Sequence, residues 1–234
     1  MGEIYAGTSG WAYAGWRPEF YPAKLSAANF LQHYAGRLNS VEVNYMFRRI
    51  ASKELLLRWV EATPADFRFA VKAHQRITHI KRLRDAAQVT AEFLASLEPL
   101  RKAKKLGPVL FQLPPNFKCD VGRLREFLAG LPPWVRAAFE FRHESWFTEE
   151  VYATLRKAGA ALCLAEDEKL TTPEVVTTDF CYLRLRKKRY SRKAVVERLH
   201  RLATSRDVFV YFKHDETPVG ALRAEALLRV VRKE

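Results

Sequence analysis

A short segment around position 140 holds the densest group of residues that could do chemistry. It reads Phe-Glu-Phe-Arg-His over residues 139–143. If this segment is a strand, Glu140 and Arg142 lie on one face of it, about 7 Å apart. An arginine beside a carboxylate keeps it ionised and can bind a substrate anion, so the pair predicts a general acid or base next to an anion site. His143 falls on the opposite face of the strand.

Polar side chains of the same kind occur near the ends of other strand-like runs. Glu42 alternates with two valines, and Lys72 ends a second alternating run. We predict that Glu140 acts as general base or acid, that Glu42 is its partner, and that Lys72 is a third catalytic group. Two acids and one lysine suffice for proton transfer, isomerisation or hydrolysis. The residues predicted to bind substrate are Arg142, Asn44, Gln112, Arg184, Lys213, Asp215, Ser9 and Trp11.

The last two members of this set come from the turn after the first strand-like run. Residues 7–10 read Gly-Thr-Ser-Gly, and the backbone amides and the Ser9 hydroxyl would suit an anion or a sugar. A simple tight turn has the same composition. Trp11 opens an aromatic-rich loop that can stack on a ligand ring or pack over the site.

Metal binding and covalent chemistry are two further interpretations of these residues. The side chains of suitable type for a metal are Glu42, Glu140, Glu166, Asp215, His74 and His143. No HxH or HExxH spacing joins them, and the nearby cations would repel a divalent ion, so we expect no metal and no cofactor. A Schiff base on Lys72 needs a lowered amine pKa, which cationic neighbours can provide. An ion pair with Glu42 or Glu140 is the simpler role for that lysine.

Residues so far apart in the sequence meet only if the fold gathers the ends of several strands. The predicted strands are residues 4–8, 40–44, 67–73, 108–113, 137–142, 160–166, 180–186 and 208–214. The predicted helices are residues 27–37, 52–61, 86–103, 121–129, 149–157, 192–204 and 221–232. This alternation predicts an α/β protein, a single (β/α)8 TIM-type barrel with parallel strands formed by one domain over residues 1–234. Only a reduced segment, 167–179, replaces the helix between strands six and seven.

The alternation within each strand indicates where the site lies. One face of a barrel strand packs against helices and the other points inward. The inward polar residues fall near the C-terminal ends of their strands, where the active sites of such barrels lie. Because buried charges are costly unless paired or solvated, a ring of them favours a functional pocket over packing. The sixth strand is ambiguous, since Leu162 and Leu164 share a face with Glu166.

The charge balance indicates an anionic partner. Forty Lys and Arg against 26 Asp and Glu give a net charge of +14. Ten of the basic residues fall between Tyr182 and Arg206, where Glu197 is the one acid. Phosphate groups, nucleic acid or an acidic protein would each fit this stretch, and so would a solvated surface helix.

Other features narrow the class of protein. No run approaches the roughly 18 apolar residues of a membrane span, and the first residues lack the basic and apolar regions of a secretory signal. The three cysteines are widely spaced and form no CxxC pair. We therefore expect a cytoplasmic protein without membrane contact.

Five segments of the chain form a recognisable signature. They are Gly-Thr-Ser-Gly-Trp at 7–11, Val-Glu-Val-Asn at 41–44, Phe-Ala-Val-Lys-Ala at 69–73, Phe-Gln-Leu-Pro-Pro at 111–115 and Phe-Glu-Phe-Arg-His at 139–143. Together they resemble the domain of unknown function 72 (YecE-like) family over nearly the whole chain. The resemblance implies a single TIM-type barrel but no reaction. Family members typically have His-Gly after the seventh strand and Asn-Asn at the end of the eighth, whereas this chain has Arg186-Lys187 and Lys213-His214.

These observations together predict an enzyme that acts on a phosphorylated or otherwise anionic small molecule, or on a nucleotide, by carboxylate acid/base chemistry at the barrel mouth. The alternative is a nucleic-acid-binding or nucleic-acid-processing protein that uses the basic region 184–206.

Overall fold

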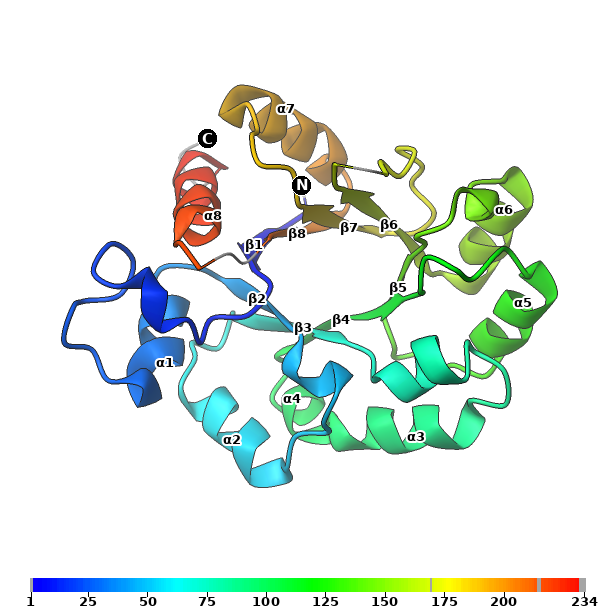
Figure 1. The fold of residues 1–234 in the computed structure, drawn as a ribbon, viewed down its shortest axis with the longest axis horizontal. Helices are drawn as coiled ribbons and strands as arrows, with labels where there is room; N and C mark the ends of the chain where they lie inside the picture. Colours follow the sequence, from blue (N-terminus) through cyan, green and yellow to red (C-terminus); the bar gives the residue numbers. More distant parts are fainter. Residues whose placement is uncertain (1, 169, 214–215, 232–234) are drawn as a thin grey trace.

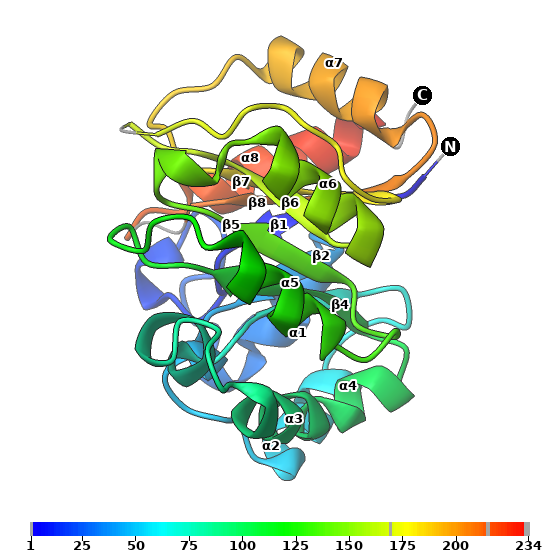
Figure 2. The ribbon, with the colours of Figure 1, turned by 90° about the vertical axis from the view of Figure 1, so that its right-hand side faces the viewer.

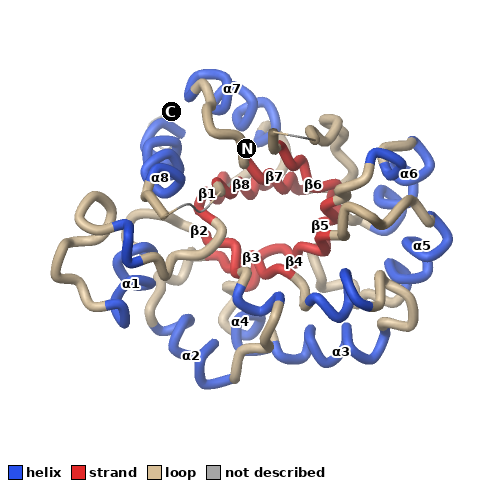
Figure 3. Tube along the Cα trace, viewed as in Figure 1, coloured by secondary structure: helices blue, strands red, loops and turns tan. Residues whose placement is uncertain are grey.

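Alternating apolar side chains build eight parallel strands, which form a ring in the computed structural model of the chain (Figures 1 and 3). The structure describes residues 2–168, 170–213 and 216–231. The strands are β1 (Ile4–Thr8), β2 (Ser40–Val43), β3 (Arg68–Lys72), β4 (Leu106–Gln112), β5 (Ala137–Glu140), β6 (Ala161–Glu166), β7 (Phe180–Leu185) and β8 (Asp207–Phe212). Each strand pairs with the next along the chain from β2 to β8, and β8 pairs with β1. The predicted eight-stranded TIM-type fold is confirmed.

The barrel closes between β1 and β2 through a short seam rather than a full ladder. Ser9 and Glu42 form an isolated parallel bridge, and the Gly10 amide donates to the Glu42 carbonyl at 2.9 Å. The backbones approach so closely that a Cβ on Gly7 would lie 1.9 Å from the Ser40 carbonyl oxygen. Glycine at position 7 is therefore a requirement of the seam.

Helices cover the outside of the strands, as the side view in Figure 2 shows. They are α1 (Phe30–Ala35), α2 (Lys53–Glu61), α3 (Ala87–Ser96), α4 (Glu98–Lys102), α5 (Val121–Ala129), α6 (Glu149–Ala158), α7 (Arg192–Ala203) and α8 (Val219–Val231). Ser52, Asp120, Thr148 and Ser191 each accept a hydrogen bond from an amide of the helix that they precede. Such caps fix the start of these helices.

Two predicted helices differ from the observed ones. The stretch 86–103 divides into α3 and α4 at Leu97, because Pro99 in the first turn of α4 has no amide with which to continue the ladder. The stretch 27–37 begins as a 3-10 turn, Ala27–Asn29, before α1. Among the described residues between β6 and β7 no helix forms, as predicted for 167–179.

The barrel interior is filled by mostly small side chains on one wall and by aromatic side chains on the other. Ala70, Leu110, Ala138, Ala161 and Cys163 from β3 to β6 pack with aromatic side chains from β7 and β8. The aromatic members are Phe180, Tyr182, Phe209 and Tyr211. The side chains at the C-terminal ends of the strands pack on this layer.

The same packing resolves the ambiguity of the sixth strand. Cys163 belongs to the interior, whereas Leu162 and Leu164 pack in the shell between barrel and helices. Glu166 shares their face, and it forms ion pairs with Arg198 of α7 and, at 3.6 Å, with Lys187. It therefore takes no part in the mouth of the barrel.

Candidate active site

At the end of β2, Glu42 is fully buried, and three neighbours hold it through its four shortest hydrogen bonds. Its Oε1 accepts from Ser9 Oγ at 2.7 Å and from Arg184 at 2.6 Å, while Oε2 accepts from Tyr182 and from Arg184 Nε, each at 2.8 Å. Burial alone raises the pKa of this carboxyl, but Arg184 and Arg186 more than reverse the effect and lower its pKa to about 2. Glu42 is therefore ionised at neutral pH.

Glu140 occupies the corresponding place at the end of β5. Gln112 Nε2 donates to both of its oxygens, at 2.9 and 3.0 Å. Arg142 Nε lies 3.2 Å from Oε1, and Arg184 forms an ion pair with Oε2. Burial raises the pKa of Glu140, and the surrounding guanidinium groups outweigh burial and lower it.

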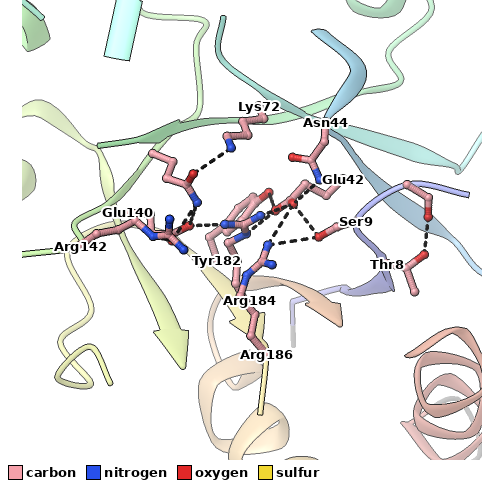
Figure 4. A network of polar contacts seen from close by, with 12 residues as sticks. Thr8, Ser9, Glu42, Asn44, Lys72, Glu140, Arg142, Tyr182, Arg184 and Arg186 are labelled. Atoms are coloured by element: carbon pink, nitrogen blue, oxygen red, sulfur yellow. Dashed lines mark hydrogen bonds and ion pairs between the residues drawn. The ribbon is translucent and has the colours of Figure 1, made fainter. Parts of the chain in front are cut away.

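Arg184 of β7 is the centre of the cluster, since its guanidinium bridges the two carboxylates (Figure 4). Only 2% of its side chain is exposed. Burial lowers the pKa of this guanidinium, but Glu140 and Glu42 raise it well above its usual value. The alternation of β2, β5 and β7 brings the three charges together, because each strand turns the same parity inward near its C-terminal end.

The two carboxylates have few lone pairs left for other partners. Besides the contacts above, Asn44 Nδ2 donates to Glu42 Oε1 at 3.2 Å. Each carboxylate oxygen thus contacts at least two donors, which is the full capacity of an ionised carboxylate. Their geometry suits holding Arg184 better than exchanging protons.

Lys72, at the end of β3, has a different environment. Its Nζ donates to Gln112 Oε1 at 2.8 Å and lies 3.8 Å from the centre of the Phe47 ring. Its hydrogen-bond partner is thus a neutral amide and not a carboxylate. Burial, helped by the charge of Arg184, lowers the pKa of Lys72 to about 8.

Arg142 and Arg186 extend the cluster toward solvent. About a third of the Arg142 side chain is exposed. Arg186 lies 3.4 Å from Ser9 Oγ and 3.8 Å from Glu42 Oε1 through Nη2. Its buried Nε has no hydrogen-bond partner among the described residues. The open side of the cluster is thus cationic.

The structure brings most of the predicted site residues into one network. Those in contact with it are Ser9, Glu42, Asn44, Lys72, Gln112, Glu140, Arg142 and Arg184. Trp11 instead packs edge-on against Trp59 of α2, with ring centres 5.0 Å apart. Lys213 is exposed just beyond β8, and Asp215 lies outside the described residues.

Four residues near the network were absent from the predicted set. Tyr182 and Arg186 follow the inward parity of β7, so strand alternation was a sufficient signal for both. Phe47 and His79 lie in the loops after β2 and β3, and their rings meet edge to face with centres 4.9 Å apart. Burial and the charges of Lys72 and Arg142 lower the pKa of His79, so its imidazole is neutral at neutral pH. Strand parity carries no information about such loop residues.

The other candidate metal ligands lie elsewhere. His74 Nδ1 accepts from the Arg76 amide at 3.3 Å, and His143 Nδ1 lies 2.9 Å from Ser145 Oγ. Within residues 2–168, 170–213 and 216–231, no group of three or more His, Cys, Asp and Glu side chains is arranged to hold a metal ion.

The basic stretch 182–206 does not form one surface. Arg184 and Arg186 lie inside the barrel mouth, while Arg198 and Arg201 of α7 are paired with Glu174, at 2.6 and 2.5 Å. Exposed basic residues remain at the start of α7, including Arg192 and Lys193.

The part of the chain that the structure describes contains no helix long and apolar enough to cross a membrane.

The ring of strands and the buried charges at their carboxyl ends define a TIM-type barrel protein with a polar, cationic mouth. The chain belongs to the family described as protein of unknown function DUF72, whose model matches residues 5–234. The predicted family is thereby confirmed.

Two curated relatives are similar to the chain over part of their length. UPF0759 protein YunF of Bacillus subtilis (strain 168) is 34% identical over 159 residues, which cover 64% of this chain and 54% of that protein. UPF0759 protein YecE of Escherichia coli (strain K12) is 33% identical over 147 residues, covering 62% and 51%. The chain spans about half the length of the curated relatives it matches.

Solved structures agree on the fold. A DUF72 family protein from Thermotoga maritima MSB8 superposes with a TM-score of 0.88 at 26% identity, over 98% of this chain and 99% of that one. An AP endonuclease of family 2 from Brucella melitensis gives a TM-score of 0.53 at 9% identity, over 94% and 96%. The second likeness concerns the barrel fold alone.

Proposed function

We propose that the chain is an enzyme that binds a small anion at the barrel mouth, either a phosphorylated or otherwise charged metabolite or a nucleotide, and transfers a proton there. The observation that carries the proposal is the charge of the mouth. The cations are Lys72, Arg142, Arg184 and Arg186, and the carboxylates are Glu42 and Glu140. Four positive charges against two negative ones leave 4 − 2 = +2, which an anionic substrate would balance.

The anion-binding role falls to the cations that are not used up inside the cluster. Arg184 is saturated by its two carboxylates, whereas Arg142 is partly exposed and Arg186 makes only long contacts. A planar guanidinium matches a carboxylate or phosphate through two parallel hydrogen bonds. We therefore assign substrate binding to Arg142 and Arg186.

The proton-transfer role falls to Lys72 in this proposal. The sequence favoured Glu140 as the acid or base, but occupied lone pairs and a lowered pKa make both carboxylates weak bases. Lys72, with a pKa of about 8, exchanges its proton near neutral pH. Glu140 and Glu42 then act as positioning residues that hold Arg184, and Glu140 also orients the lysine through Gln112.

Calorimetric titration with inorganic phosphate tests the proposal. Wild-type protein should bind phosphate, and Arg142→Gln should weaken the affinity by about tenfold or more, because a hydrogen bond to a charged group contributes roughly 1.5–3 kcal/mol. Lys193→Gln, which removes an equal charge from an exposed site on α7, should leave the affinity unchanged. Absence of phosphate binding, or equal weakening in both variants, would refute an anion site at the mouth.

A further inference from the structure

The amine of Lys72 is held in a way that leaves it available for reaction. Gln112 Oε1 accepts a hydrogen bond from it, and the Gln112 amide is fixed in this orientation because its Nε2 donates to Glu140. The Phe47 ring covers another side of the amine at 3.8 Å. No carboxylate contacts the ammonium group among the described residues, so the charged form lacks a direct ion pair.

The charges that act on Lys72 come from the ends of three strands. Burial disfavours the ammonium form most, and Arg184 of β7 and Arg186 just after that strand disfavour it too, whereas Glu42 of β2 and Glu140 of β5 favour it. With a pKa of about 8, roughly a tenth of the amine is unprotonated at pH 7. An ordinary lysine has about 300-fold less free amine at that pH.

His79 contacts the same aromatic ring, Phe47, as the Lys72 amine does. The imidazole and the Phe47 ring pack edge to face with centres 4.9 Å apart, and His79 Nδ1 lies 2.9 Å from Thr78 Oγ1. Lys72 is among the charges that lower the pKa of His79. Because its imidazole is neutral, His79 is available as a proton acceptor at this end of the site.

We propose that Lys72 is a nucleophile that forms an imine with the carbonyl group of an anionic aldehyde or ketone. The inference rests on the proposed function, because the anionic part of the substrate would bind Arg142 and Arg186 while the carbonyl carbon faces the amine. It also names the substrate class of that site: a small oxo acid or a phosphorylated aldose or ketose.

The step balances without any other reactant. The Lys72 nitrogen attacks the carbonyl carbon, and the C=O π pair moves to oxygen and is protonated there. The neutral amine gives up two protons, which leave with the oxygen as water, and a C=N bond replaces the C=O bond. Uptake of one proton from solvent gives the protonated imine. This imine withdraws electrons from the neighbouring carbon, so proton abstraction or C–C cleavage at that position becomes easier.

Reductive trapping tests the inference with glyoxylate, the smallest probe that has both a carboxylate and an aldehyde. The protein is treated with glyoxylate and sodium cyanoborohydride at neutral pH, and the modified residue is located by peptide mass spectrometry. We expect Lys72 to be the first lysine modified, roughly a hundredfold faster than the average surface lysine because of its larger fraction of free amine. Acetaldehyde, which lacks the anion, should show a much smaller preference for Lys72.

Two variants and one binding measurement complete the experiment. Lys72→Arg keeps the charge and should abolish the fast phase, and Lys193→Arg, at an exposed position on α7, should retain it. Modification of Lys72 no faster than that of surface lysines would overturn the inference. If phosphate still binds in that case, the proposed anion site stands and only the imine chemistry fails; loss of both would refute the two proposals together.

Discussion

At the scale of single residues, the structure depends most on Arg184. Its guanidinium neutralises two carboxylates that are themselves almost wholly buried. Replacing it by methionine leaves both charges unpaired inside the barrel, so Arg184→Met should lower the free energy of unfolding by about 3–5 kcal/mol. Urea denaturation would measure the loss. Arg156→Met on α6, where the ion pair with Glu149 is exposed, serves as the control and should change stability by no more than about 0.5 kcal/mol. A loss of similar size in both variants would contradict the central role of Arg184.

A second prediction concerns Glu42 and the dependence of the free energy of unfolding on pH. Its pKa falls from 4.5 to about 2 on folding, so its contribution to stability is fully present above pH 4.5 and disappears as the pH drops toward 2. The shift corresponds to about 3 kcal/mol. Stability measured from pH 6 downward should fall more steeply for wild type than for Glu42→Gln by about this amount. Parallel curves for the two proteins would show that folding does not lower the pKa of Glu42.

At the scale of elements, the seam between β1 and β2 places Ser9 and Glu42 against each other. A Cβ at Gly7 would overlap the Ser40 carbonyl, so Gly7→Ala must push the strands apart. We expect a loss of about 2 kcal/mol or more in thermal or chemical unfolding, as for other overpacked sites. Gly122→Ala in α5 makes the same chemical change where the nearest atom is 3.7 Å away, and it should cost nothing. Tolerance of Gly7→Ala would mean that the seam is loose.

The alternation of polar and apolar residues within the strands could be used to predict which strand side chains meet, but not the loop contacts. Alternating apolar residues indicated which side chains of β2, β3, β5 and β7 point into the barrel. This pattern correctly predicted that four charged residues are neighbours, namely Glu42, Lys72, Glu140 and Arg184. Parity says nothing about loops, so the contact of Phe47 with Lys72 could not be predicted. The sequence also could not show that hydrogen-bond donors occupy the oxygens of both carboxylates, because this depends on side-chain distances and not on the spacing of residues in the sequence.

At the scale of the whole molecule, the surplus of positive charge is divided between the mouth and the outer helices. Since Arg184 and Arg186 lie inside the mouth and Arg198 and Arg201 are paired with Glu174, four basic residues of the stretch 182–206 remain exposed. They are Lys188, Arg189, Arg192 and Lys193. We therefore expect weak duplex-DNA binding with a log–log salt slope no steeper than about −4, measured by fluorescence anisotropy, because each phosphate contact contributes about −0.9. A slope of about −6 or steeper would need more contacts than this stretch exposes and would support the nucleic-acid alternative.

The proposed chemistry depends on a lysine at a cationic mouth that exchanges its proton near neutral pH and responds to an anion. NMR of the reductively ¹³C-methylated protein, with the Lys72 signal assigned from Lys72→Arg, follows this amine directly. Without ligand, the signal should titrate with a midpoint of about 8, and saturating phosphate should raise the midpoint because a bound anion stabilises the ammonium form. A midpoint near 10.5, the ordinary lysine value, that phosphate leaves unchanged would contradict the account.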